Sequence, residues 1–193
     1  MVHKFDEKKM KKLDNPERRK IMPAKEILIN LGLKEEDTFA DIGCGIGYFS
    51  LPACKIVGET GQVYGIDISD VMLTECKKKI DELEIKNMKL LKSTEYSLGI
   101  KSKEISFAFM CNVLHEVEDK EKFIKEIKET LKEKGKLAII DWQKKETKKG
   151  PPIEDRLEKE EVKKLLKNHG FVNIKIMDIE EEFYSLIGTI DFE

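Results

Sequence analysis

The chain has 193 residues, of which 40% are hydrophobic and 38% are charged. This length suits one domain with a core and room for a ligand crevice. The 36 basic residues nearly balance the 38 acidic ones, for a net charge of −2, which argues against a strongly basic nucleic-acid-binding face. No apolar run reaches the ~20 residues of a membrane helix. The charged N-terminus has no apolar stretch typical of a secretory signal, so we expect a cytoplasmic protein.

The first half of the chain alternates helix and strand. Asn15 and Pro16 are typical of a helix start, and this helix is expected to break at 22–23 and to resume over 24–31. The following predicted elements are, in order, a strand at 38–42, a glycine loop at 43–47, a helix at 48–57, a strand at 62–68, a helix capped by Ser69 and a strand at 88–91.

The second half continues the alternation and then changes. The predicted elements are a strand at 105–111, a helix at 120–132, a strand at 136–142, a loop at 143–157, a helix at 158–169 and strands at 171–177 and 182–190. Because no helix separates the last two strands, we expect them to form an antiparallel hairpin. The repeated strand–helix units predict an α/β fold, with a doubly wound, seven-stranded and mostly parallel sheet.

The four cysteines are not arranged for a metal site. Cys44, Cys54, Cys76 and Cys111 include no C-x-x-C pair, and no histidine lies at zinc-finger spacing from them. Disulfides are not expected without a secretory signal. We therefore predict no metal site, and we interpret Cys54, Cys76 and Cys111 as small core residues.

The glycine loop carries the strongest chemical signal. Asp41, Gly43, Gly45 and Gly47 form a D-x-G-x-G-x-G pattern between a predicted strand and a predicted helix. The nicotinamide-dinucleotide pattern G-x-G-x-x-G would need a third glycine where Tyr48 stands. An acid ahead of the loop would repel a pyrophosphate but suits an ammonium or sulfonium group. The loop therefore predicts a nucleoside ligand that carries positive charge.

A second acid stands at the end of the next predicted strand. The carboxylate of Asp67 can accept hydrogen bonds from two ribose hydroxyls. Either feature alone is also compatible with an ordinary turn or helix cap. Both together, in a strand–loop–helix–strand context, indicate a nucleoside site.

With these motifs, the chain resembles a class I S-adenosylmethionine-dependent methyltransferase over residues 22–193. The resemblance implies that Asp41 holds the methionine end of the cofactor and that Asp67 holds the ribose. It also implies that Ile68 and Met72 lie against the adenine. The cofactor-binding residues implied by the resemblance are Asp41, Gly43, Cys44, Gly45, Asp67, Ile68, Met72, Thr94, Glu95 and Asn112.

The chain departs from the family pattern after the third predicted strand. Ser93 stands where the family usually has an acid that reads the adenine amino group, so Glu95 or the backbone near Thr94 is expected to replace it. Residues 109–117 resemble the segment beside the acceptor pocket in small-molecule methyltransferases near the ubiquinone and menaquinone C-methylating enzymes. This resemblance implies a small-molecule acceptor rather than a nucleic acid or protein.

His115 is the candidate general base, because it follows a predicted strand at the ligand edge and has a near-neutral reference pKa. The alternative is that it only hydrogen-bonds the backbone. Asp141 could face the pocket, and His169 is expected to cap a helix. Tyr184 could touch the acceptor or pack in the sheet.

The remaining expectations concern the N-terminal segment and basic residues near the site. Residues 1–22 could form a lid, and residues 23–193 are expected to form the methyltransferase domain. Arg18, Arg19 and Arg156 could meet an anionic acceptor or could be solvated surface charges.

Three other functions are compatible with the sequence. These are a non-catalytic S-adenosylmethionine-binding module, an NAD-dependent oxidoreductase and an arsenite methyltransferase. The oxidoreductase fits the loop spacing less well. The arsenite enzyme would need several thiols around the acceptor, whereas no cysteine follows Cys111.

Overall fold

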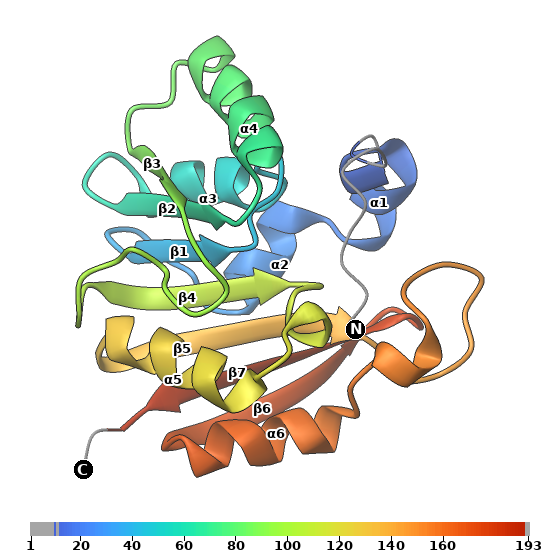
Figure 1. Cartoon of the computed structure of the whole chain (residues 1–193). Helices are drawn as coiled ribbons and strands as arrows, with labels where there is room; N and C mark the ends of the chain where they lie inside the picture. Colours follow the sequence, from blue (N-terminus) through green and yellow to red (C-terminus); the bar gives the residue numbers. More distant parts are fainter. Residues whose placement is uncertain (1–9, 11, 192–193) are drawn as a thin grey trace.

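A seven-stranded sheet forms the centre of the computed structural model, which describes residue 10 and residues 12–191 (Figure 1). The strands are β1 (Thr38–Ile42), β2 (Gln62–Asp67), β3 (Met88–Lys92), β4 (Ile105–Cys111), β5 (Leu131–Trp142), β6 (Phe171–Ile179) and β7 (Phe183–Ile190). Their order is β3-β2-β1-β4-β5-β7-β6. Only β7 runs antiparallel to its neighbours, β5 and β6. The predicted fold class and the terminal hairpin are therefore confirmed.

Helices cover both faces of the sheet (Figure 1). The α-helices are α1 (Pro16–Ile21), α2 (Ala24–Asn30), α3 (Ser50–Val57), α4 (Asp70–Glu82), α5 (Lys120–Thr130) and α6 (Lys159–Asn168). Short 3₁₀ turns occur at η2 (Leu114–Glu116) and η3 (Ile153–Asp155). One face packs on α2, α3 and α4, and the other packs on α5 and α6.

Alternation along each strand sends side chains into two separate cores. In β4, Phe107 and Phe109 join the core under α2, α3 and α4, whereas Ala108 and Met110 join the core under α5 and α6. Because both faces of the central strands are covered, their sequences read as continuous apolar runs.

Several element bounds differ from the predicted ones. The helix predicted at 48–57 begins at Ser50, because Gly47–Phe49 forms a turn. In this turn, the Tyr48 hydroxyl donates a hydrogen bond to the Met22 carbonyl oxygen at 2.7 Å. The helix predicted at 120–132 ends at Thr130. Leu131 instead pairs with Ile105 and begins β5, five residues earlier than predicted.

The strand order places a switch point between β1 and β4. From β1 the chain proceeds outward through β2 and β3, and it then returns to the other side of β1 as β4. The loops that leave β1 and β4 therefore diverge, which opens a crevice at the carboxyl ends of these strands.

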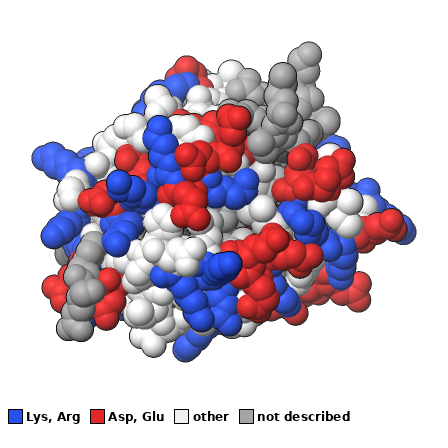
Figure 2. Space-filling view, turned by 60° about the horizontal axis from the view of Figure 1, so that its bottom comes forward, with Lys and Arg blue, Asp and Glu red and all other residues white. Residues whose placement is uncertain are grey.

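The surface carries both signs of charge. Figure 2 shows basic and acidic side chains intermingled on one face of the molecule. Among the residues that the structure describes, no helix is long and apolar enough to cross a membrane.

Candidate active site

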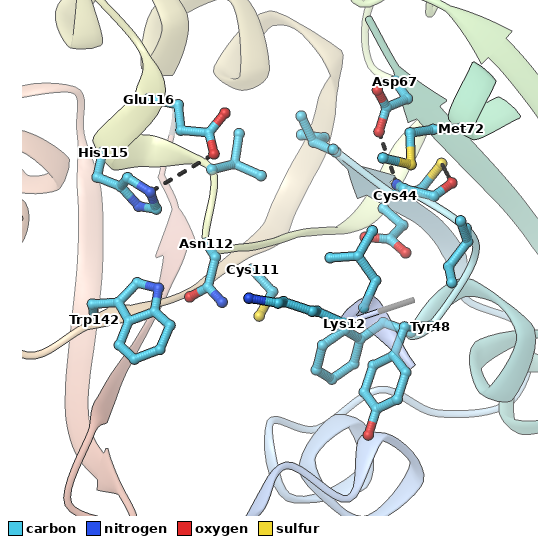
Figure 3. A pocket seen from close by; sticks show the side chains of 18 of the residues that line it. Lys12, Cys44, Tyr48, Asp67, Met72, Cys111, Asn112, His115, Glu116 and Trp142 are labelled. Carbon is cyan, nitrogen blue, oxygen red and sulfur yellow. Dashed lines mark hydrogen bonds and ion pairs between the residues drawn. The ribbon is translucent and has the colours of Figure 1, made fainter. Parts of the chain in front are cut away.

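A cavity of about 920 Å³ lies at the carboxyl ends of β1, β2 and β4 (Figure 3). It is lined by His115 and by every residue that the sequence assigned to the cofactor, namely Asp41, Gly43, Cys44, Gly45, Asp67, Ile68, Met72, Thr94, Glu95 and Asn112. Its volume lies within the range of small-molecule sites. The structure thus brings residues from four separate parts of the chain, 41–45, 67–72, 94–95 and 112–115, to one place.

The glycine loop needs its glycines for close packing. Gly43 has a φ of 74°, and a Cβ there would lie 2.3 Å from Val113 Cγ2. At Gly47, with a φ of 84°, a Cβ would lie 2.8 Å from Cys76 Sγ. A side chain at either position would therefore be disfavoured both by the positive φ angle and by the lack of room for a Cβ atom.

Asp67 fastens this loop to the end of β2. Its carboxylate accepts hydrogen bonds from the Gly45 N–H at 2.8 Å and from the Ser69 N–H at 2.9 Å. Burial raises the pKa of Asp67, and the backbone N–H groups oppose that shift. Since a carboxylate offers about four acceptor positions, Asp67 retains capacity for ribose hydroxyls.

Asp41 is a buried acid on the floor of the cavity. Only 3% of its surface is exposed, and the Ser50 hydroxyl donates a hydrogen bond to it. Burial raises the pKa of Asp41 to about 7, the Ser50 hydrogen bond opposes this, and the charge of Asp67 adds to it. A cationic ligand group would favour the charged form of this carboxyl group.

His115 forms a buried pair with Asp141. The distance from His115 Nδ1 to Asp141 Oδ1 is 2.7 Å, and Asp141 also accepts the Trp142 N–H at 2.8 Å. Burial lowers the pKa of His115, but the hydrogen bond and charge of Asp141 outweigh it, so the net shift is upward. The other ring nitrogen, Nε2, lies 3.8 Å from Glu116 Oε1 (Figure 3). Asp141 is not among the cavity-lining residues; it lies behind His115 and orients it.

The segment after β3 is already hydrogen-bonded within the protein. Glu95 Oε1 accepts the Glu118 N–H at 2.9 Å and the Tyr96 hydroxyl at 2.9 Å. The Thr94 N–H donates to the Ser97 carbonyl at 3.0 Å. Glu95 and Thr94 thus border the cavity in a turn that is held by hydrogen bonds within the protein.

Two of the three arginines considered as anion-binding residues lie elsewhere. Arg18 lines the cavity, whereas Arg19 points away and pairs with Asp14 at 2.7 Å. Arg156 is 4% exposed and donates hydrogen bonds within the loop after β5. Both interpretations of Arg156, as an acceptor contact and as a solvated surface charge, are therefore wrong, because its guanidinium is buried and hydrogen-bonded inside the protein.

Two other expectations are resolved by packing. Tyr184 is fully buried in β7 and is not among the residues that line the cavity, so it packs in the sheet. His169 is the C-cap of α6, and its Nδ1 lies 3.0 Å from the Leu165 carbonyl oxygen, as a capping residue should.

An aromatic wall of the cavity was missed in the sequence. Trp142 and Phe183 both line the cavity, with ring centroids 4.3 Å apart. They meet because β7 inserts beside β5 and pairs these two residues in register. Only the strand order could have revealed this wall, and the sequence pattern does not specify that order.

Comparison with known proteins agrees with this architecture. Residues 33–186 match the family described as a methyltransferase domain. A demethylmenaquinone methyltransferase of Bacillus mycoides is 27% identical over 117 residues, which cover 61% of this chain and 49% of that protein. A 2-phytyl-1,4-naphtoquinone methyltransferase of Trichormus variabilis is 30% identical over 112 residues, or 58% of this chain and 49% of that protein. The chain thus spans about half the length of these curated relatives.

A solved structure resembles almost the whole chain. A SAM-dependent methyltransferase from Aquifex aeolicus is 35% identical, with a TM-score of 0.91, and the match covers 97% of this chain and 100% of that one. The family match extends over most of the domain and includes the glycine loop, Asp67 and His115. The chain belongs to the methyltransferase-domain family and has the fold of the S-adenosylmethionine-dependent methyltransferases.

Proposed function

We propose that this protein transfers the methyl group of S-adenosylmethionine to a small-molecule acceptor. The observation that carries the proposal is the single cavity at the switch point, which all the residues expected to bind this cofactor line. When bound, S-adenosylmethionine supplies an electrophilic methyl group on a sulfonium. The protein's own contribution is then to hold two reactants in line, which is worth up to ~7–11 kcal/mol.

The chemistry of the donor set fits this cofactor. Asp67 has unused acceptor positions for ribose, and Asp41 offers a buried carboxyl group for an ammonium. The side-chain oxygen of Asn112 is buried without a hydrogen-bond partner in the structure, so a donor from a ligand would satisfy it. Ile68 and Met72 provide apolar surface beside Asp67 for a base.

His115 is the proposed general base. In its neutral form His115 would donate a hydrogen bond from Nδ1 to Asp141, and its Nε2 atom, 3.8 Å from Glu116 Oε1, would then carry the lone pair that accepts a proton. As the acceptor atom forms its bond to the methyl carbon and the sulfur–carbon bond breaks, Nε2 would take the proton that the acceptor loses. The acceptor must then be protic, as a phenol or hydroquinone is.

The rest of the cavity supports an aromatic acceptor. Trp142 and Phe183 offer flat apolar surface on the His115 side, and two relatives are named for methylating naphthoquinone compounds. We therefore place the acceptor among small aromatic molecules with an ionisable hydroxyl group.

The proposal includes the domain organisation and location. Residues 23–193 would form the methyltransferase domain, and residues 1–22 would form a lid, of which residues 1–9 and 11 lie outside the part of the chain that the structure describes. Lys12, Arg18 and Ile21 border the cavity, and Lys149 pairs with Glu17 at 2.5 Å across its rim, which supports the lid. We also propose a cytoplasmic location.

Calorimetric titration with S-adenosylhomocysteine tests the cofactor assignment. We expect micromolar binding by the wild type and no binding of NADH. Asp67→Asn should weaken the binding by about 2 kcal/mol, or about 30-fold, because a charged acceptor is lost. Asp70→Asn is the matched control, since the side chain of Asp70 is exposed and lies outside the cavity. Binding of NADH alone would refute the proposal.

The role of His115 is tested by turnover of a panel of reduced naphthoquinones and phenols. His115→Gln should lower kcat by about 10²- to 10⁴-fold, as the loss of a general base does, with little effect on the Kd of S-adenosylhomocysteine. Since only neutral His115 is basic, wild-type activity should fall as the pH drops through a pKa above 6.5, and Asp141→Asn should move that pKa downward. His169→Gln, outside the cavity, should leave turnover unchanged. Equal turnover by His115→Gln and wild type would return His115 to a structural role.

A further inference from the structure

Arg18 reaches the cavity from α1 and is held there by its neighbours. Tyr48 fixes the end of α1 through its hydrogen bond to the Met22 carbonyl. The Arg18 guanidinium carbon lies 4.7 Å from the centroid of the Tyr48 ring. This ring is itself set edge-on to Phe49, with centroids 5.2 Å apart. The position of the guanidinium is therefore determined before any ligand arrives.

Among the described residues, the guanidinium of Arg18 has no strong hydrogen-bond partner. Its Nε atom is buried without a partner, and Nη2 makes only a weak contact with Cys111 Sγ at 4.0 Å. Within the part of the chain that the structure describes, no carboxylate forms an ion pair with Arg18. A buried donor of a charged group without an acceptor is rare in folded proteins. At a cavity wall, an anionic ligand would supply the missing acceptor.

A buried acid shares the cavity with this cation. Asp41 stands at the end of β1, and the positive charge of Arg18 lowers its pKa, against the upward effect of burial. The two groups therefore interact through the space between them. One carboxylate and one guanidinium facing the same space complement a ligand group that carries an ammonium and a carboxylate together.

We propose that Arg18 binds the α-carboxylate of the methionine part of the cofactor, while Asp41 binds its α-ammonium group. This inference rests on the proposed function and adds to it a residue from outside the glycine loop. It makes α1 part of the cofactor site rather than only a cover. A guanidinium suits this task because its fork matches the two oxygens of a carboxylate.

The other cations near the cavity are less suited to this role. Lys12 lines the cavity and extends toward Cys111 and Asn112 (Figure 3), but the residue is exposed and its amine does not offer the bidentate fork of a guanidinium. Lys149 is 60% exposed and already pairs with Glu17. Arg19, the next residue on α1, is bound to Asp14 outside the cavity. Arg19→Gln therefore removes the same charge from the same helix without touching the cavity, and it serves as the matched control.

Two ligands that differ only in the α-carboxylate test the contact of Arg18 with that group. We would titrate wild type, Arg18→Gln, Arg18→Lys and Arg19→Gln with S-adenosylhomocysteine and with its decarboxylated analogue, S-adenosyl-3-thiopropylamine. Arg18→Gln should bind S-adenosylhomocysteine about 10- to 100-fold more weakly than wild type, as expected for a lost charge-assisted bidentate contact. Its affinity for the decarboxylated analogue should match that of wild type. Arg18→Lys should give an intermediate loss, and Arg19→Gln should give none.

The comparison separates the possible failures. If Arg18→Gln weakens both ligands equally, Arg18 acts by holding α1 and the inference is overturned. If Arg18→Gln binds S-adenosylhomocysteine as tightly as wild type, the carboxylate lies elsewhere and the inference is also overturned. Failure of wild type to bind S-adenosylhomocysteine would instead refute the proposed function itself. Thermal melting of each variant verifies that the proteins compared are folded.

Discussion

The carboxyl group of Asp41 illustrates how neighbours distant in sequence set the chemistry of one residue. Its place before the glycine loop was sufficient to mark it as a ligand residue. Its pKa of about 7 depends instead on burial in the middle of the sheet, on Ser50 from the start of α3 and on Asp67 from β2. A linear pattern contains none of these contacts. The place of Asp41 at the cavity is predictable from sequence, but its protonation state is not.

This pKa should make cofactor binding depend on pH near neutrality. An ammonium-bearing ligand binds the charged form of Asp41, so below about pH 7 binding must first remove a proton. We expect the affinity for S-adenosylhomocysteine to fall up to tenfold per pH unit below that point. Calorimetry at pH 6 in two buffers of different ionisation enthalpy should report the release of a proton.

Ser50→Ala tests whether the pKa of Asp41 causes the pH dependence of cofactor binding. Without the Ser50 hydrogen bond, which lowers the pKa of Asp41, the pH at which affinity declines should rise. Ser106→Ala removes a similar hydroxyl near the opposite end of β1, where it bonds Asp37 and Thr38, and should not move the transition. An affinity that stays constant between pH 6 and 8 would contradict this account of Asp41.

At the scale of elements, the loop after β5 is organised by one side chain. Arg156 donates to the carbonyl oxygens of Gln143, Lys145, Lys149 and Pro151 and to the hydroxyl of Thr147 at 2.7–3.1 Å. Its guanidinium also lies 5.2 Å from the Trp142 ring centroid. All five of its N–H donors can thus be satisfied by one loop. The sequence shows a polar loop with an arginine, whereas the convergence of carbonyls on that arginine exists only in the folded chain.

Arg156→Lys should loosen this loop and affect the acceptor more than the cofactor. Lysine keeps the charge but cannot reach five acceptors from one plane, so Lys149, Gly150 and Pro151 at the cavity rim lose their support. We expect faster hydrogen exchange over 143–151 and an acceptor KM raised by about tenfold. The Kd of S-adenosylhomocysteine should change less than twofold.

Lys159→Gln is the control for this change, because the ion pair of Lys159 with Asp178 lies on the exposed surface. It should leave both hydrogen exchange in the loop and the acceptor KM unchanged. Unaltered exchange over 143–151 in Arg156→Lys would show that the loop holds its shape without the guanidinium.

For the whole molecule, the periodicity of the hydrophobic residues predicted the strands and helices but not which strands pair with one another. Continuous apolar runs and amphipathic helices alternate strictly enough to predict seven strands and a doubly wound sheet. The position of β7 between β5 and β6 depends on which strands pair in the folded sheet, and the hydrophobic pattern does not specify this. That pairing brings Phe183 beside Trp142 and buries Tyr184. The part of the cavity lined by residues 41–45 and 67–72 comes from local motifs and was therefore predictable, whereas the wall formed by Trp142 and Phe183 was not.

The interior position of β7 also bears on how the protein is made. Translation delivers β7 after every other strand, yet β5 and β6 are joined only through it. Until residues 183–190 have left the ribosome, the nascent chain presents β5 as an unpaired apolar edge, which other chains can extend by strand pairing. A truncation that removes residues 183–190 would thus disrupt the middle of the sheet rather than trim one of its edges. The sheet can close only after these residues have been synthesised.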